Sequence, residues 1–236
     1  MSKQNRITNN PRWQQYRHWL YVLVLPVYLA LFFITEHFIG SDANYAVIYH
    51  PLDDLIPFCE WFYIPYVLWY PFMGLVGLYL AFKDGEGFKR YMTYIGVSFI
   101  AAIGLFVLFP NGQDLRPDLA TLGRENLFTR AIAALYIADT NTNVCPSLHV
   151  VGSMAAVFGI LHHPRLCKTV WLPIGGVILA VLICLSTVFL KQHSVVDVFV
   201  GIPYGFLIYG AVYWLPALWQ KRKSKPHSAR IAAKKP

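Results

Sequence analysis

The stretch VWLPIGGVILAVLICLSTVFL, residues 170–190, indicates the fold class because its 21 residues include no charged side chain. The stretch is apolar on all sides and is too long for a β-strand. A helix needs about 20 apolar residues to cross the hydrocarbon core of a bilayer, so residues 170–190 are predicted to span a membrane. The segment that follows, KQHSVVD at 191–197, places a histidine and an aspartate beside that membrane.

The rest of the chain has the same character. Hydrophobic residues make up 56% of the sequence and charged residues only 14%, whereas a soluble domain is about one quarter charged. Further apolar runs occupy residues 19–39, 61–82, 91–109, 146–161 and 195–219. We therefore predict an all-α, polytopic membrane helix bundle with about six transmembrane helices.

Domain organisation follows from these runs. We expect one membrane-embedded domain over residues 1–236, made of a basic N-terminal segment (1–18), the bundle (19–219) and a basic tail (220–236). The N-terminus lacks the apolar core and cleavage site of a removable signal peptide, so the first run is expected to remain as a span.

Lysine and arginine are distributed unequally between the two sides that six spans define. Sixteen fall on the side of the termini, and four fall on the other: Arg116, Arg124, Arg130 and Lys191. Because basic residues near span ends are retained in the cytoplasm, both termini are expected there. The 110–145 loop and the starts of the fourth and sixth spans then face the extracytoplasmic side of a cell membrane, bacterial or equivalent.

The remaining compositional signals are weaker. The basic tail either contacts anionic lipid headgroups or only anchors the topology. Nothing in the sequence indicates nucleic-acid binding, and the oligomeric state is left open. The four cysteines show no metal-ligand spacing, and Cys59 and Cys145 are either a disulfide or two isolated small apolar residues.

Polar residues converge on the outward side. His193 and Asp197 are four residues apart, which places them on one helical face within reach of a hydrogen bond. An aspartate that accepts from one ring nitrogen leaves the other nitrogen as a free nucleophile or base. The alternative is purely structural, because Ser194 to Asp197 also matches a capping box.

Two further residues point to phosphate chemistry. Ser147 is a possible cap of the fourth span, and His149 would lie in its first turn beside unpaired N–H groups that attract anions. Arg116 offers a fork of donors suited to phosphate oxygens. Two histidines, an aspartate and an arginine on one face describe a site where one histidine attacks phosphorus and the other protonates the leaving oxygen.

These motifs resemble the type-2 phosphatidic acid phosphatase superfamily, which also includes bacterial haloperoxidases and sphingolipid headgroup transferases. The family pattern is Lys-x6-Arg-Pro, then Pro-Ser-Gly-His, then Ser-Arg-x5-His-x3-Asp. The chain matches it with Arg116-Pro117, with Pro146-Ser147-Leu148-His149, and with Ser186-Thr187 followed by His193 and Asp197. The resemblance covers residues 109 to about 219, and the six-span layout extends it to the rest.

The resemblance implies a role for each matching residue. His193 would be the nucleophile that forms a phosphohistidine, Asp197 its orienting partner, and His149 the acid for the leaving group. Arg116 and Ser147 would bind the substrate phosphate. No cofactor and no metal is implied.

The chain also departs from the family pattern. Phe109 aligns with the family lysine and Thr187 with the arginine of the third motif, so two phosphate-binding cations are missing. Lys191 is a candidate phosphate ligand in place of one of them, or it snorkels to the interface. Asn111 and Gln113 are candidates for further hydrogen bonds to phosphate.

The acceptor of the phosphoryl group distinguishes two functions. Pro-Ser-Leu-His and the missing arginine resemble the inositol phosphorylceramide synthase branch, which transfers a phosphoryl headgroup from one lipid to the hydroxyl of another. We expect a lipid phosphatase or phosphotransferase that acts on a lipid phosphate or phospholipid. Hydrolysis is the leading interpretation, and a headgroup transferase is the alternative.

Three other functions fit the same residues less well. His149, His193 and Asp197 could hold zinc, but neighbouring cations oppose a metal ion. A hydrolase with Ser147 as nucleophile lacks the G-x-S-x-G turn. A transporter or scaffold that binds lipid phosphate would need no oriented nucleophile. The outer segment HPLDD (50–54) is predicted to form a solvated re-entrant turn. Alternatively, it lines the entrance to the site.

Overall fold

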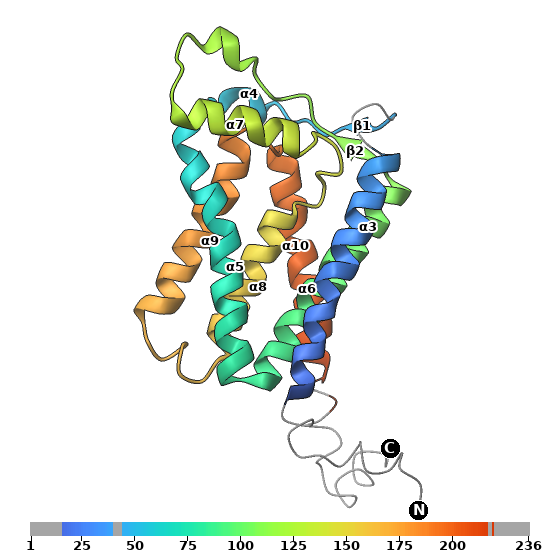
Figure 1. Ribbon diagram of the computed structural model, residues 1–236, viewed down its shortest axis with the longest axis vertical. Helices are drawn as coiled ribbons and strands as arrows, with labels where there is room; N and C mark the ends of the chain where they lie inside the picture. The colour runs from blue at the N-terminus through green and yellow to red at the C-terminus, as the bar shows by residue number, and fades with distance from the viewer. Residues whose placement is uncertain (1–15, 40–43, 217–218, 220–236) are drawn as a thin grey trace, which may run out of the picture.

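The computed structural model describes residues 16–39, 44–216 and 219, and Figure 1 shows a bundle of helices. Five helical segments of the described chain are long and apolar enough to cross a membrane: Arg17–Phe38, Glu60–Lys83, Gly85–Leu108, Trp171–Phe189 and Val195–Trp214. The protein is therefore an integral membrane protein of the all-α class, as predicted. Residues 1–15 and 220–236, which hold most of the two basic segments, lie outside the described chain.

The spans are built from the following elements. They are η1 (Arg17–Leu23) with α3 (Val24–Phe38), η2 (Glu60–Phe62) with α5 (Tyr63–Lys83), α6 (Gly85–Leu108), α9 (Trp171–Phe189), and α10 (Val195–Tyr209) with the π-helix η4 (Gly210–Trp214). Pro71 lies inside α5 and Pro203 inside α10. Such prolines are tolerated in membrane helices because neighbouring groups satisfy the freed carbonyls.

The fourth predicted span is α8 (Leu148–His162), which has fifteen residues and is therefore about 22 Å long. It lies in the middle of the bundle and packs against α5, α6, α9 and α10 (Figure 1). Non-helical backbone at membrane depth is tolerated where protein encloses it. A short central helix therefore leaves room for an enclosed polar site above its first residue.

Two glycines allow close approach around α8. A Cβ on Gly152 would lie 2.6 Å from the sulfur of Met73 and 2.8 Å from the Trp69 ring. A Cβ on Gly201 of α10 would lie 3.2 Å from Val150. Small residues at such positions let membrane helices pack backbone to backbone. The close packing brings α5 and α10 against the first turns of α8.

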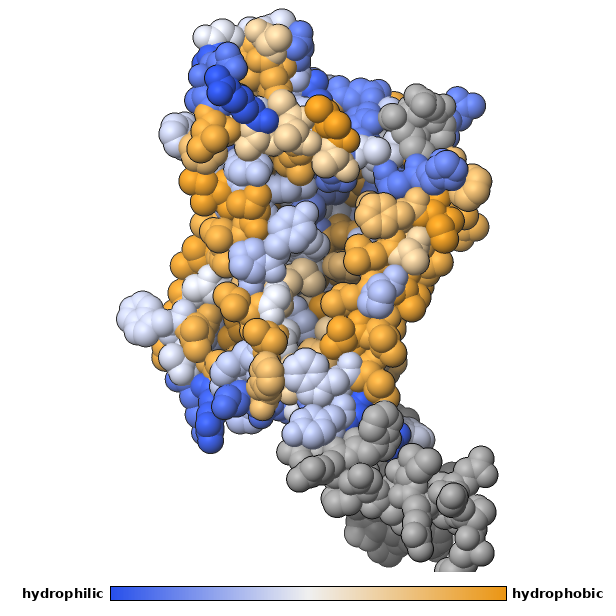
Figure 2. Space-filling view, viewed as in Figure 1, coloured by the Kyte–Doolittle hydropathy of each residue, from blue (hydrophilic) through white to orange (hydrophobic). Residues whose placement is uncertain are grey.

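The surface separates apolar sides from polar ends. Figure 2 shows hydrophobic residues along the flanks of the bundle and hydrophilic residues concentrated at its two ends. Phe82, Leu75 and Leu207 are among the large apolar side chains that point outward from the spans. Exposed apolar flanks of this extent are typical of a surface that contacts lipid or another protein, and helices long enough to span a membrane favour lipid here.

Short elements cap the end of the bundle opposite the start of η1 (Figure 1). They are β1 (Ala46–Val47), α4 (Leu52–Leu55), β2 (Asn111–Gly112), η3 (Leu119–Leu122) and α7 (Leu127–Ala138), with β1 and β2 paired in parallel. The expectation of a plain loop over 110–145 was wrong for α7. Asn126 and Thr129 form a capping box at its start, which stabilises this twelve-residue helix.

Candidate active site

The loop between α9 and α10 places His193 at the capped end of the bundle. Its Nδ1 donates to Asp197 Oδ2 at 3.1 Å, and the same carboxylate oxygen accepts from Ser194 N at 3.0 Å. The His193–Asp197 hydrogen bond and the capping box that this spacing predicts are therefore both present, and they share one carboxylate oxygen. Within the described residues, His193 Nε2 has no hydrogen-bond partner and is available for chemistry.

His149 faces this histidine from the first turn of α8. The two imidazole centroids are 5.7 Å apart. The Tyr66 and Trp69 rings of α5 each lie 4.6 Å from the His149 ring and hold it in place. His149 Nε2 is buried and has no protein partner in the described chain. The structure thus brings together the two histidines that the sequence singled out.

Ser147 is the N-cap residue of α8, but its hydroxyl makes no capping hydrogen bond. Its Oγ is buried without a partner among the described residues. The N-terminal N–H groups of a helix and an unpaired hydroxyl are both suited to an anion. The unpaired polar groups of Ser147 and His149 are therefore two residues apart at this helix start.

Arg116 is brought to the site, but most of its donors bind protein. Its NH1 donates to Tyr136 O at 3.0 Å, and its NH2 donates to Asp139 O at 2.9 Å and Thr140 O at 2.7 Å. NH2 also contacts Gln192 Oε1 at 2.5 Å. Its Nε is buried and has no partner in the described chain. Burial lowers the pKa of Arg116, which still remains a cation near neutral pH.

Lys191 and α4 hold the loop that carries His193. The Lys191 ammonium donates to Asp53 O at 2.6 Å, and burial lowers its pKa. The Asp53 carboxylate accepts from Ser194 Oγ at 2.6 Å and from Val195 N at 2.8 Å. The expectation of a solvated turn was wrong for Asp53, which is 0% exposed. Its side chain caps α10 from 142 residues away in the sequence.

Asn111 and Gln113, which were candidate phosphate donors, use their amides for the fold. Gln113 Nε2 donates to Lys191 O at 2.9 Å, and Asn111 Nδ2 donates to Cys145 O at 3.1 Å. Their side-chain oxygens accept from backbone N–H groups. The two amides therefore support the loops of the site rather than offer hydrogen bonds to a ligand.

Thr187 and Phe109, the two positions that depart from the family pattern, lie in different surroundings. Thr187 is fully buried, and its hydroxyl donates to Cys184 O at 2.8 Å within α9. Phe109, at the end of α6, is 70% exposed. Neither side chain hydrogen-bonds to His149 or His193 in the described chain, although the Thr187 carbonyl accepts from His193 N at 3.1 Å.

Two residues of the site were not predicted. Gln192 is 3% exposed, and its Oε1 faces Arg116, so its Nε2 is left buried without a partner in the described chain. Asp139 follows α7 and accepts from the Tyr66 hydroxyl at 3.3 Å. Burial raises the pKa of Asp139, although electrostatic interactions of its carboxylate with His193 and Arg116 oppose the rise. In the sequence, Gln192 could have been found only through its position next to His193. No feature of the sequence pointed to Asp139.

Metal binding and cysteine chemistry have less support at this site. No group of three or more His, Cys, Asp or Glu side chains in the described ranges is arranged to hold a metal ion. Burial and the nearby Asp197 carboxylate raise the pKa of the Cys145 thiol to about 12, so this thiol stays protonated near neutral pH. Cys59 and Cys145 are free cysteines, which excludes the disulfide considered above.

A protein-family model matches the part of the chain that contains most of this site. Residues 90–221 match the family model described as the PAP2 superfamily. The match extends from α6 through α10 and includes Arg116, Ser147, His149, His193 and Asp197. No curated protein gives a significant match to the chain.

Proposed function

Because the chain belongs to the PAP2 superfamily, we propose that it is an integral membrane phosphatase or phosphotransferase that cleaves a phosphate ester of a lipid through a phosphohistidine on His193. The observation that carries the proposal is the orientation of this residue. Asp197 fixes Nδ1 at 3.1 Å, Nε2 is unpaired, and a second histidine ring lies 5.7 Å away.

The reaction has two steps. His193 Nε2 attacks phosphorus and forms an N–P bond, while the bond from phosphorus to the leaving oxygen breaks and protonated His149 gives that oxygen its proton. Water or an alcohol then attacks phosphorus, His149 takes the proton of the attacking hydroxyl, and the N–P bond breaks. In both steps His149 must reach the oxygen that leaves or attacks the phosphorus bound at His193.

In this proposal, negative charge on the phosphate is held by donors that have no other partner among the described residues. These are Arg116 Nε, Gln192 Nε2, the Ser147 hydroxyl and the N–H groups at the start of α8. Donors fixed before the reaction stabilise charge that develops in the transition state. Lys191 is a further phosphate ligand in this proposal, and the bond from its ammonium to Asp53 O also positions the loop of His193.

We place the site on the extracytoplasmic side of a cell membrane. The support is the count of sixteen basic residues on the side of the termini against four on the other. The start of α10, which His193 precedes by two residues, lies at the end of the bundle that α4 and α7 cap, opposite the start of η1 (Figure 1). A lipid phosphate in the outer leaflet would present its headgroup at that depth.

A headgroup transferase is the second candidate. Arg116 and Lys191 direct donors to protein carbonyls, and the Asp139 carboxyl lies close enough to interact with His193. A phosphate monoester dianion gains less from such a site than it would from free cations, and a diester monoanion requires less positive charge. This arrangement favours a phospholipid donor and a lipid alcohol as acceptor.

The test compares variants and substrates in detergent or vesicles. His193→Gln is expected to abolish release of phosphate from phosphatidic acid, and His149→Ala to lower it at least about 100-fold. His37→Gln, at an exposed histidine of α3 outside the site, is the control. Full activity of His193→Gln would refute the proposal. A ceramide acceptor that diverts the phosphoryl headgroup of a phospholipid from water would establish the transferase.

A further inference from the structure

The connections from α5 to α6 and from α8 to α9 meet at the end of the bundle opposite α4 and α7 (Figure 1). They enclose a polar pocket with a volume of about 300 Å³, which we call the basal pocket. Its lining residues are Tyr79, Lys83, Asp84, His163, Pro164 and Arg165. His149 lies in the first turn of α8 and His163 directly follows its last residue, so about 21 Å of helix separates the basal pocket from the candidate active site.

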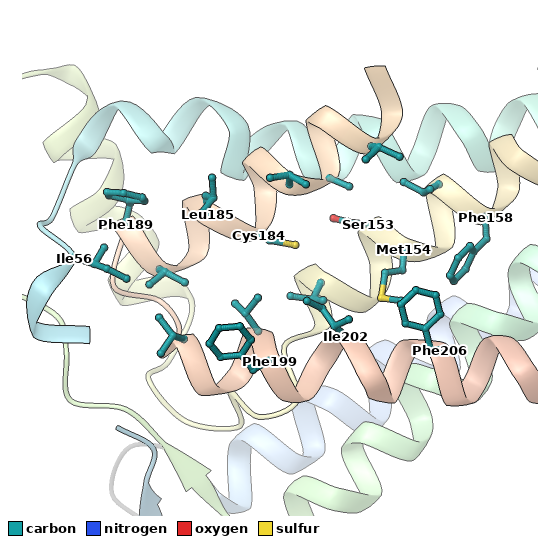
Figure 3. A pocket seen from close by; sticks show the side chains of 18 residues that line it. Ile56, Ser153, Met154, Phe158, Cys184, Leu185, Phe189, Phe199, Ile202 and Phe206 are labelled. Atoms are coloured by element: carbon teal, nitrogen blue, oxygen red, sulfur yellow. The ribbon is translucent and has the colours of Figure 1, made fainter. Parts of the chain in front are cut away.

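Two basic side chains of the basal pocket are free to bind an anion. Lys83 ends α5, Arg165 lies in the turn after α8, and both are exposed. Neither side chain has a hydrogen bond or an ion pair within the described residues, whereas Lys89 at the same end is paired with Glu86 at 2.5 Å. The basal pocket therefore differs from the apolar cleft of about 460 Å³ between α8, α9 and α10, which no charged side chain lines (Figure 3).

His163 adds a donor that is held in a fixed position. Its side chain is largely buried, and the residue is 5% exposed. Its Nδ1 accepts from Arg165 N at 3.3 Å and from Leu166 N at 3.2 Å, so the ring carries its proton on Nε2. The Tyr79 ring packs edge to face against it, with the centroids 5.2 Å apart. Nε2 has no partner in the part of the chain that the structure describes, so its N–H group is left for a ligand.

Asp84 limits the charge that the basal pocket can hold. Its Oδ1 accepts from Gly87 N at 2.9 Å and caps α6, and its carboxylate forms no ion pair with Lys83 or Arg165 in the described chain. Two basic side chains and one carboxylate leave a single net positive charge in the lining. A group with one negative charge is therefore matched better than a group with two.

The basal pocket lies at the level where the spans end. Lys83 is the last residue of the segment Glu60–Lys83, Asp84 precedes the segment Gly85–Leu108, and both segments are long and apolar enough to cross a membrane. The headgroups begin where such spans leave the hydrocarbon core. Phe82, next to Lys83, is 68% exposed on the flank of the bundle. A phospholipid in this leaflet therefore presents its phosphate to the pocket and its acyl chains to the flank.

We propose that the basal pocket binds the phosphate diester of an anionic phospholipid, such as phosphatidylglycerol, in the leaflet at this end of the bundle. Lys83 and Arg165 contact the phosphate oxygens, and His163 Nε2 donates to one of them. The bound lipid joins the end of α5 to the turn after α8. The proposal concerns a second site and does not rest on the proposed function at His193.

The first experiment measures binding without turnover. Full-length His193→Gln protein in detergent is titrated with phosphatidylglycerol, and native mass spectrometry gives the Kd of each bound lipid. The double variant Lys83→Gln with Arg165→Gln should weaken one binding event about tenfold, the loss expected for two exposed charge contacts. Lys168→Gln, which removes an exposed charge from the same connection outside the pocket, should weaken none. Equal weakening by both variants, or by neither, would overturn the proposal.

The second experiment tests the match of charge. In Asp84→Asn the side-chain oxygen still accepts from Gly87 N, so α6 stays capped, but one negative charge is removed. The variant should strengthen binding of phosphatidic acid, whose phosphate monoester carries up to two charges, about threefold more than binding of phosphatidylglycerol. A ratio of the two Kd values equal to that of the parent protein would show that Asp84 does not select the ligand.

The third experiment distinguishes a lipid from a phosphate in solution. Inorganic phosphate and glycerophosphoglycerol, the headgroup without acyl chains, should not displace phosphatidylglycerol at about 100-fold excess. Displacement by either at equal concentration would refute the lipid assignment. Phosphatidylglycerol should also raise Tm of the wild type more than Tm of the double variant, because a ligand stabilises the state that binds it. An equal rise in both proteins would contradict a site at Lys83 and Arg165.

Discussion

At the scale of single residues, one oxygen of Asp197 orients His193, the proposed nucleophile, and caps a helix. It accepts from His193 Nδ1 and from Ser194 N. The sequence spacing fits both roles. In a capping box the acid is three residues after the N-cap, so it is also four residues after the residue that precedes the N-cap, which here is His193. Helix α10 therefore begins with the same contacts that fix the tautomer of His193.

Gln192 is predicted to stabilise the transferred phosphoryl group through its unpaired Nε2. Gln192→Leu should lower kcat about 100-fold, the cost of losing one fixed donor in a transition state. It should weaken inhibition by orthovanadate, which mimics that transition state, by a similar factor. Gln113→Leu removes an amide that bonds only to the fold and should lower Tm instead. Unchanged vanadate inhibition in Gln192→Leu would show that its amide is structural.

Asp139 is predicted to make stability depend on pH. Burial raises the pKa of its carboxyl above the ordinary value of 3.8, so the folded state binds this proton more tightly than the unfolded state. The contribution to stability is complete below pH 3.8 and is lost as pH rises through the raised pKa. Asp139→Asn should therefore raise Tm above that window and leave it unchanged below. A variant whose Tm differs from wild type equally at all pH values would contradict this pKa.

At the scale of elements, α4 is a clamp on the start of α10. Asp53 accepts from Ser194 and Val195, and its carbonyl accepts from Lys191. The loop that carries His193 is thus fastened on both sides of that residue. The clamp is formed by a four-residue helix that has no counterpart among the family motifs.

Asp53→Ala is expected to cost about 2–4 kcal/mol of unfolding free energy, because it leaves several buried donors without an acceptor. It should also lower kcat, since the His193 loop is released. Asp54→Ala is the matched control, because Asp54 is exposed and its one hydrogen-bond partner in the described part of the chain is the exposed Tyr49 hydroxyl. Thermal unfolding in detergent and kcat on phosphatidic acid measure the two effects. Equal Tm for the two variants would refute the clamp.

The elements differ in how well the sequence predicts them. Spans were predictable because a helix in lipid needs about 20 apolar residues, and residues 170–190 meet that need without help from other segments. Helix α7 was not predictable in the same way, because twelve residues in a polar connection show only weak helical periodicity. Asn126 and Thr129, which form its capping box, were nevertheless present in the sequence.

The site shows the same contrast. His193 and Asp197 are close in sequence, so their contact follows from helix geometry. The contacts of Asp53 with Val195, and of Arg116 with Gln192, join residues 142 and 76 positions apart. Local spacing carries no information about such pairs, and the charge of Arg116 alone did not reveal that carbonyl groups occupy most of its donors.

At the scale of the whole molecule, the distribution of charge predicts the side of the membrane on which the histidines lie. In a cysteine-free background, Ala120→Cys at the capped end should react with an impermeant thiol reagent in intact cells. Lys168→Cys, in the connection between α8 and α9, should react only after permeabilisation. Both positions are exposed in the structure. The reverse pattern would place the site in the cytoplasm.

The central claim is that the phosphoryl group passes through His193, and trapping the phosphoenzyme tests it most directly. Protein mixed with ³²P-labelled phosphatidic acid and quenched in alkali within milliseconds should carry label on His193, and acid should release it. His193→Gln should carry none, while His149→Ala should form and lose the label more slowly. An acid-stable label on Ser147, or label that persists in His193→Gln, would contradict the account.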